Sequence, residues 1–108
     1  MKPDEKKPYK LKKKAIMYEL GREEILSQLT EECCELGQAA QKVRRSIKGT
    51  TPVTFADASA KLEEETADVL TCLEMLIDWG MIGLEHVAKI QSKKVNRWFT
   101  RTFGGREE

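Results

Sequence analysis

The sequence feature that most constrains the fold is an apolar repeat between Arg22 and Ile47. Apolar residues recur there in steps of three and four: Leu26, Leu29, Cys33, Leu36, Ala40, Val43 and Ile47. Such steps place one stripe of side chains along a single face of an α-helix. Gly49 follows the repeat, and glycine is common just after the end of a helix. The repeat therefore predicts one long amphipathic helix that must bury one face.

A second apolar stripe follows a linker at residues 50–55. It consists of Leu62, Thr66, Val69, Leu73 and Leu76. Thr54, with Asp57 three residues later, resembles a capping box, in which the first side chain accepts a hydrogen bond from the backbone of the first turn. These features predict a second long helix that runs to about Trp79.

Glycines delimit two further helical segments. Gly80 and Gly83 bracket a turn, after which the pattern predicts a third long helix over residues 84–99. A short helix is expected over residues 9–20, where Gly21 interrupts it. Long helices joined by short loops typically pack as an antiparallel bundle.

The length of 108 residues is enough for one domain, and only three prolines interrupt the helical patterns. We therefore expect an all-α fold in a single domain over residues 1–108. The expected architecture is an antiparallel bundle of three long helices plus a short N-terminal helix, with a basic tail at residues 1–8 and a C-terminal tail at residues 104–108.

Composition bounds the partners and the compartment. The net charge of +1 argues against a nucleic-acid partner, and no apolar run approaches the roughly 20 residues of a membrane span. The three cysteines, Cys33, Cys34 and Cys72, are an odd number and a poor disulfide framework. We therefore expect a cytoplasmic protein with neither a membrane nor a nucleic-acid partner.

Two pairs of acids lie beside the two stripes. Successive helical residues are about 100° apart, so Glu32 and Glu35 lie about 100° and 160° from the centre of the first stripe, on one ridge. Glu65 and Asp68 lie about 60° and 120° from the centre of the second stripe, which makes Glu65 the most inward acid. Antiparallel packing of the two helices would bring these four carboxylates together.

Four carboxylates in a small volume repel one another and lose hydration. No lysine or arginine lies three or four residues from Glu32 or Glu35. A hard divalent cation would resolve this conflict, and Mg²⁺ prefers oxygen ligands of this kind. Spacing alone leaves a second interpretation open: the acids form solvated faces or interact with the helix dipole, and Lys61 pairs with Glu65.

The ordered motifs resemble those of one enzyme family. The segment Glu31–Glu35 resembles the E-E-x-x-E helix of the MazG-like nucleotide pyrophosphohydrolases. The segment Glu65–Leu70 is similar to their second signature, E-x-x-D followed by Val-Leu, and Lys94–Arg97 is similar to a basic K-x-x-R segment on the third helix. The resemblance covers roughly residues 25–100, in the same order and spacing.

The resemblance implies a function and a set of roles. It implies an all-α enzyme, a dimer or a dimer of dimers, that hydrolyses nucleoside triphosphates to the monophosphate and pyrophosphate with Mg²⁺, or with Mn²⁺. The metal ligands would be Glu32, Glu35, Glu65 and Asp68, Glu31 would be a second-shell or base candidate, and the phosphate-binding residues would be Lys94 and Arg97. As a mechanism, we expect Glu35 or Glu31 to be the catalytic acid that accepts the proton of the attacking water.

We expect water to attack the α-phosphorus, in a reaction that cleans the nucleotide pool. Two alternatives remain. The first is a non-enzymatic helical module whose apolar stripes form a homo-oligomer. The second is a nucleic-acid binder that uses the N-terminal lysines and the basic residues of the third helix, although the acidic ridges argue against it.

Overall fold

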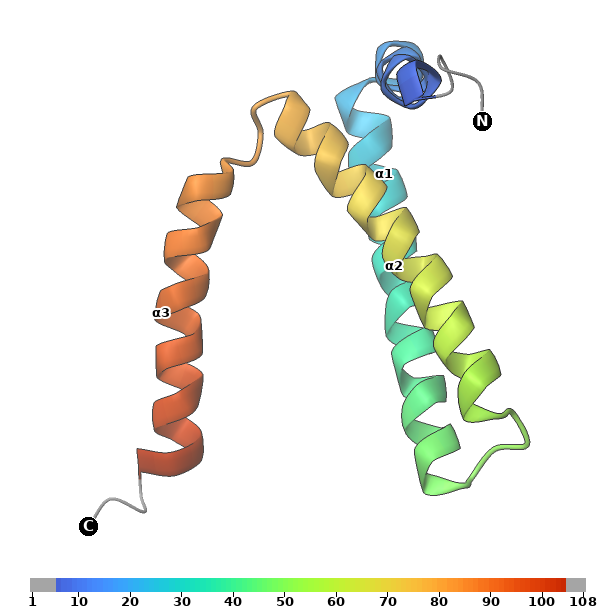
Figure 1. Ribbon diagram of the computed structural model, residues 1–108. Coiled ribbons are helices and arrows are strands. Elements are labelled where there is room, and N and C mark those ends of the chain that lie inside the picture. The colour runs from blue at the N-terminus through green and yellow to red at the C-terminus, as the bar shows by residue number, and fades with distance from the viewer. Residues whose placement is uncertain (1–5, 105–108) are drawn as a thin grey trace. The chain divides into compact units, whose positions relative to one another are not determined.

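The chain is built from three helices in the computed structural model, which describes residues 6–104 (Figure 1). These are α1 (Lys6–Lys48), α2 (Phe55–Asp78) and α3 (Leu84–Phe103). No strand occurs among residues 6–104, so the all-α prediction is confirmed. The predicted tails fall mostly on residues 1–5 and 105–108, which lie outside the described residues. Residues 6–8 of the expected N-terminal tail belong to α1 instead.

The short N-terminal helix expected over residues 9–20 is not separate, because it forms the first part of α1. Gly21 marks the junction, with φ 82° and ψ 168° inside the helix. This conformation is open almost only to glycine, which lacks the Cβ atom that would clash with the backbone. The chain changes direction there, and the segments before and after Gly21 run at an angle to one another (Figure 1).

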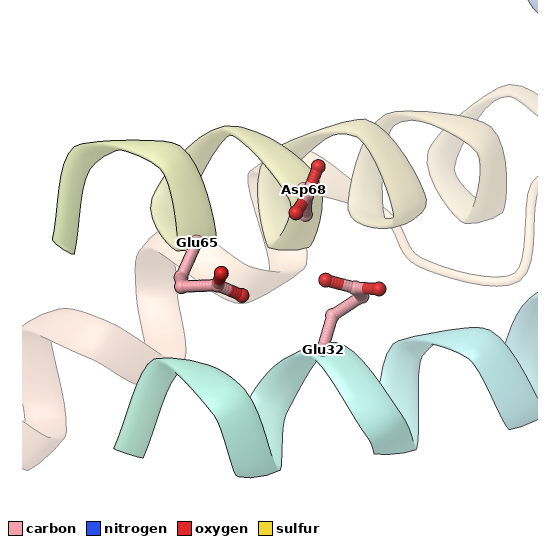
Figure 2. Close-up of side chains that lie close together, drawn as sticks. All are labelled: Glu32, Glu65 and Asp68. Atoms are coloured by element: carbon pink, nitrogen blue, oxygen red, sulfur yellow. The ribbon is translucent and has the colours of Figure 1, made fainter. Parts of the chain in front are cut away.

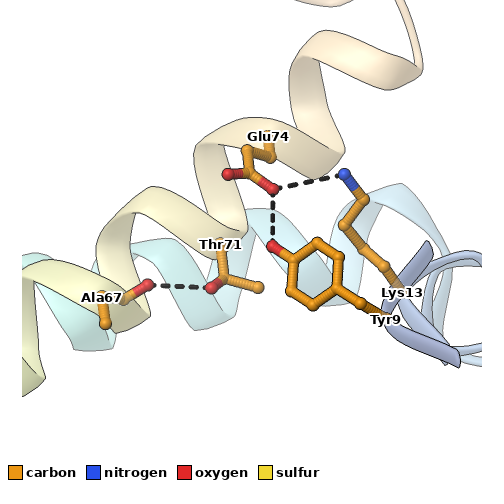
Figure 3. A network of polar contacts seen from close by, with 5 residues as sticks. All are labelled: Tyr9, Lys13, Ala67, Thr71 and Glu74. Atoms are coloured by element: carbon orange, nitrogen blue, oxygen red, sulfur yellow. Dashed lines mark hydrogen bonds and ion pairs between the residues drawn. The ribbon is translucent and has the colours of Figure 1, made fainter. Parts of the chain in front are cut away.

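Helices α1 and α2 pair in antiparallel fashion, as predicted (Figure 1). Near the start of α1, the Tyr9 hydroxyl donates a hydrogen bond of 2.9 Å to Glu74 Oε1, near the end of α2. Lys13 Nζ lies 3.2 Å from the same oxygen (Figure 3). Further along α1, Glu32 faces the middle of α2. This order of contacts is possible only if the two helices run in opposite directions.

Local sequence signals fix both ends of the α1–α2 connection. Gly49 ends α1 with φ 72°, and its N–H donates to Ser46 O at 3.3 Å. The N–H of Thr50 donates to Arg45 O at 3.0 Å, which completes a Schellman motif. The Thr54 hydroxyl accepts a hydrogen bond of 3.1 Å from the N–H of Asp57, so the predicted cap of α2 is confirmed.

The core of the helix pair is small. Its buried apolar residues are Met17, Ile25 and Ala39 from α1 and Ala58, Cys72, Met75 and Leu76 from α2. Helices α1 and α2, up to Leu76, form one compact unit, and the residues from Ile77 onward form a second. Helix α3, in the second unit, has no buried residue. The packing of α3 as the third member of a bundle stays a prediction.

The buried face of α1 differs from the stripe expected around Cys33. Helix α2 partly covers one half of that stripe, at Leu29, Leu36 and Val43. The other half, spaced by seven residues, is exposed: Leu26, Cys33, Ala40 and Ile47. The centre of the contact has moved round by about one residue, onto the line that holds Ile25 and Ala39. Glu32 lies on this same line, between them.

The stripe of α2 is rotated in the same sense. Thr66, expected to face inward, is exposed and donates its hydroxyl proton to Leu62 O at 2.7 Å. Glu65 and Cys72 are buried in its place. Both helices therefore present an acid, not only apolar residues, to the interface between them.

Candidate metal centre

Three carboxylates from two helices converge at the middle of the α1–α2 pair. Glu32 comes from α1, and Glu65 and Asp68 come from successive turns of α2 (Figure 2). One carboxylate oxygen from each residue lies within 4.8 Å of the other two. In Figure 2 the side chains of Glu32 and Glu65 extend toward each other from facing helices. The predicted convergence of acids is therefore observed for these three residues.

Glu65 is the most enclosed of these acids. It is 4% exposed and is the one buried polar or charged residue of the part of the chain that the structure describes. The inward position that helical geometry predicted for Glu65 is confirmed. Its Oε1 pairs with Lys61 Nζ at 3.0 Å, one turn earlier on α2. Its Oε2 is buried and has no hydrogen-bond partner among the described residues.

Glu32 has the same arrangement on the facing helix. Gln28 Nε2 donates a hydrogen bond of 2.8 Å to Glu32 Oε1. Glu32 Oε2 is buried and, within residues 6–104, without a hydrogen-bond partner. A buried carboxylate oxygen without a donor is costly, and native structures usually satisfy such groups. Two such oxygens on opposing helices, with Asp68 beside them, are a donor set that suits a hard divalent cation.

Glu35, the fourth predicted ligand, lies next to this cluster but is not among the three converging acids. A side-chain hydrogen bond to Glu65 and the charges of Glu65 and Glu32 raise the pKa of Glu35 above its ordinary value, while Lys61 acts in the opposite direction. Glu35 thus holds a proton more readily than an isolated glutamate does.

The thiol chemistry near the cluster favours oxygen ligands over sulfur. Cys72 is buried one turn beyond Asp68 on α2. Burial, and then the charges of Glu32, Asp68 and Cys33, raises the pKa of the Cys72 thiol. A thiol that keeps its proton is a poor ligand for zinc, because thiolate is the ligating form. The carboxylates of Glu32, Glu65 and Asp68 are therefore the better candidate ligands in this part of the helix pair.

The other predicted site residues lie apart from this cluster. Glu31 is exposed on α1, on the side of the helix that the sequence places away from the ridge. Lys94 and Arg97 are exposed on α3 and lie three residues apart, so they are neighbours on the helix surface. The roles of these residues in proton transfer and phosphate binding stay predictions.

A groove adjoins the acids along the second half of α1. Its volume is about 890 Å³, and Glu35 and Glu65 contribute to its wall. Two cations that the sequence analysis did not single out, Lys42 and Arg45, also line it. A signal for Lys42 was present, because a residue seven positions after Glu35 lies on the same face of a helix. This spacing is a weak signal, because the pattern is short and the chain has many lysines, any of which can match it by chance.

Comparisons with protein-family models, with curated proteins and with solved structures gave no match. Among the helices that the structure describes, none combines the length and the apolar character that a membrane crossing requires. The features of this chain that point to a function are therefore the acidic cluster, the groove beside it and the sequence motifs.

Proposed function

We propose that this protein is a Mg²⁺-dependent hydrolase that converts nucleoside triphosphates to the monophosphate and pyrophosphate, as a member of the MazG-like family. The observation that carries this proposal is the pair of buried, unpartnered oxygens, Glu32 Oε2 and Glu65 Oε2, on facing helices with Asp68. Such a pair is costly in a purely structural helix contact, and a bound cation would offset that cost.

The proposed metal ligands are Glu32, Glu35, Glu65 and Asp68, and the support for them is the convergence of Glu32, Glu65 and Asp68. Mg²⁺, or Mn²⁺ in its place, would neutralise phosphate charge and lower the pKa of a coordinated water. Mg²⁺ in phosphate-processing sites is usually held by carboxylates together with waters and substrate phosphates, so these acids would suit it.

A carboxylate of the chain would accept the proton of the attacking water. Water adds to the α-phosphorus, the bond from that phosphorus to the bridging oxygen breaks, and pyrophosphate leaves. Glu35 is the proposed acceptor of the proton of the attacking water, because its pKa is raised toward the working pH by Glu65 and Glu32. Glu31 is the second candidate. Lys94 and Arg97 are proposed to contact the phosphates, Arg97 as a two-pronged donor and Lys94 as a point charge.

We propose that the protein works as a homodimer or homotetramer. Two sets of exposed apolar residues support this assembly. On α1, Leu26 is 40% and Ile47 is 69% exposed, with Cys33 and Ala40 on the line between them. On α3, Val87, Ile90 and Trp98 are exposed on one face. Exposed apolar patches of this kind are common at interfaces between protein chains.

The experiment that tests the activity is a panel of canonical and modified nucleoside triphosphates, assayed for pyrophosphate with and without Mg²⁺. The variants Glu32→Gln and Asp68→Asn should lose the activity. Glu63→Gln is the matched control, because Glu63 is an exposed acid of α2 outside the cluster. A folded wild-type protein that hydrolyses no triphosphate would overturn the proposal.

The exposed apolar residues of α1 and α3 also favour a second candidate, a helical homo-oligomeric module without enzymatic activity. This candidate predicts that Glu32→Gln and Asp68→Asn leave the protein unchanged or more stable in metal-free buffer, and that Mg²⁺ has no effect on its stability. Activity against a triphosphate would exclude it. If the enzymatic proposal holds, cleaning of the cytoplasmic nucleotide pool is the proposed role.

A further inference from the structure

The groove beside the acidic cluster has opposite charges at its two ends. Glu35 and Glu65 form its acidic end, and Lys42 and Arg45 line it further toward the end of α1. Glu35 and Lys42 are seven residues apart, which places them on one face about 10 Å apart along the axis. Arg45 follows Lys42 on the same surface after three more residues. The groove therefore runs from negative to positive charge along α1.

The side chains of Lys42 and Arg45 are not used by the fold. Within residues 6–104, neither makes an ion pair or a side-chain hydrogen bond, whereas Lys61, the third cation of the groove, pairs with Glu65 at 3.0 Å. A cation in the last turn of a helix can simply stabilise the dipole, and Arg45 is in the last turn of α1. Lys42 is not in that turn, so the dipole does not account for it.

The acidic end of the groove carries an independent sign of a ligand. Glu65 lines the groove, is 4% exposed, and has a buried Oε2 without a partner among the described residues. The groove volume of about 890 Å³ lies within the range of about 300–1,000 Å³ that is usual for small-molecule sites. The groove is thus large enough for a nucleotide.

We infer that Lys42 and Arg45 bind the β- and γ-phosphates of the triphosphate, whose α-phosphate lies at the acidic cluster. This inference rests on the proposed function and fixes the direction of the substrate: the polyphosphate tail follows α1 toward its C-terminal end. When the bond between the α-phosphorus and the bridging oxygen breaks, pyrophosphate takes its electron pair. Lys42 and Arg45 stabilise that charge as it develops, alongside any contribution from Lys94 and Arg97.

The test uses the full-length protein and a double variant, Lys42→Gln with Arg45→Gln. The matched control is Arg44→Gln with Lys48→Gln, which removes two charges from exposed positions on the same part of α1 that do not line the groove. Binding of inorganic tripolyphosphate and of a nucleoside monophosphate is measured by calorimetry in the presence of Mg²⁺. Circular dichroism checks that both variants keep the helical content of the wild type.

The inference predicts that the groove variant binds tripolyphosphate at least about tenfold more weakly than wild type. Its affinity for the monophosphate should stay within about twofold, because the monophosphate lacks the β- and γ-phosphates. Equal weakening in the control variant, equal weakening for the two ligands, or no weakening at all would overturn the inference.

The outcome also separates this inference from the proposed function. If wild type hydrolyses triphosphates but the groove variant binds tripolyphosphate normally, the function stands and the groove assignment fails. If wild type hydrolyses no triphosphate but only the groove variant loses tripolyphosphate binding, the groove is a polyphosphate site and the proposed reaction fails.

Discussion

Lys61 Nζ lies 3.0 Å from Glu65 Oε1, so an exposed lysine neutralises one side of the most buried acid of the helix pair. The other carboxylate oxygen of Glu65 is left without a partner among the described residues. The Lys61–Glu65 pair therefore compensates the buried charge only in part, and the remainder is available to a cation.

Replacing Lys61 tests this partial compensation. We expect Lys61→Met to lower the free energy of unfolding of the metal-free protein, because it leaves a buried carboxylate without its cation. Urea denaturation measures the loss. The double variant Lys61→Met with Glu65→Gln should recover most of it, and failure to recover would show that Lys61 acts through contacts other than Glu65.

Removing the charge of Glu65 should separate stability from activity. In metal-free buffer, Glu65→Gln should unfold at the same or a higher temperature than wild type, because it removes repulsion among three acids. Its pyrophosphate release should fall at least about 100-fold. Mg²⁺ at 100 times its dissociation constant should stabilise wild type by about 2.7 kcal/mol and Glu65→Gln much less. An equal stabilisation of both proteins would contradict the assignment.

The stability of the metal-free protein should depend on pH through Glu35. Its pKa is raised in the folded state, so the folded protein holds this proton more tightly than the unfolded chain does. The resulting stabilisation is complete below the ordinary carboxyl pKa of 4.5 and is lost as the pH rises through the raised value. Urea midpoints across this range should fall for wild type, and the fall should be smaller for Glu35→Gln. Parallel profiles for the two proteins would argue against the contact with Glu65.

The three cysteines should differ in reactivity toward iodoacetamide. Cys33 and Cys34 are exposed, whereas Cys72 is buried and its pKa is raised by burial and by Glu32, Asp68 and Cys33. We expect Cys72 to react much more slowly than the other two, because thiolate is the reactive form. Mass spectrometry of the alkylated protein measures the three rates, and in urea they should become similar.

The kink at Gly21 should not tolerate a side chain. Its φ of 82° and ψ of 168° are open almost only to glycine, so Gly21→Ala should cost about 1–3 kcal/mol of stability. Gly37→Ala is the matched control, since Gly37 lies within α1 and an added Cβ there would meet no atom within 4 Å. This control should be neutral or stabilising by up to about 1 kcal/mol. Urea denaturation compares the two.

The sequence predicted the helices well because their ends carry local signals. Gly49 and Thr54 make the hydrogen bonds expected of a C-cap and an N-cap. Glu65 was also predicted to be the most inward acid, since helical geometry depends only on residue spacing. The rotation of the contact face was not predicted. An apolar stripe on α1 can be covered from either side, and a single chain does not reveal that Leu36 faces α2 while Cys33 does not.

The predicted acidic site was recovered only in part, for a related reason. The convergence of Glu32, Glu65 and Asp68 follows from antiparallel packing, which the short linker enforces. Whether Glu35 joins the three converging acids or lies beside Glu65 depends on side-chain rotamers, which spacing does not determine. Lys42 and Arg45 line the groove because of the way α1 packs against α2. The sequence alone does not determine which face of α1 makes this contact.

Helix α1 contacts helix α2 on both sides of the bend at Gly21, so the α1–α2 pair is joined at both of its ends. The linker joins α1 to α2 at one end, and the contact of Tyr9 and Lys13 with Glu74 joins them at the other, across 65 and 61 residues of sequence. Glu65 and Asp68 lie between these two closures along α2. A slide of one helix along the other would break the contact of Tyr9 and Lys13 with Glu74, so this contact favours the register in which the acids face one another.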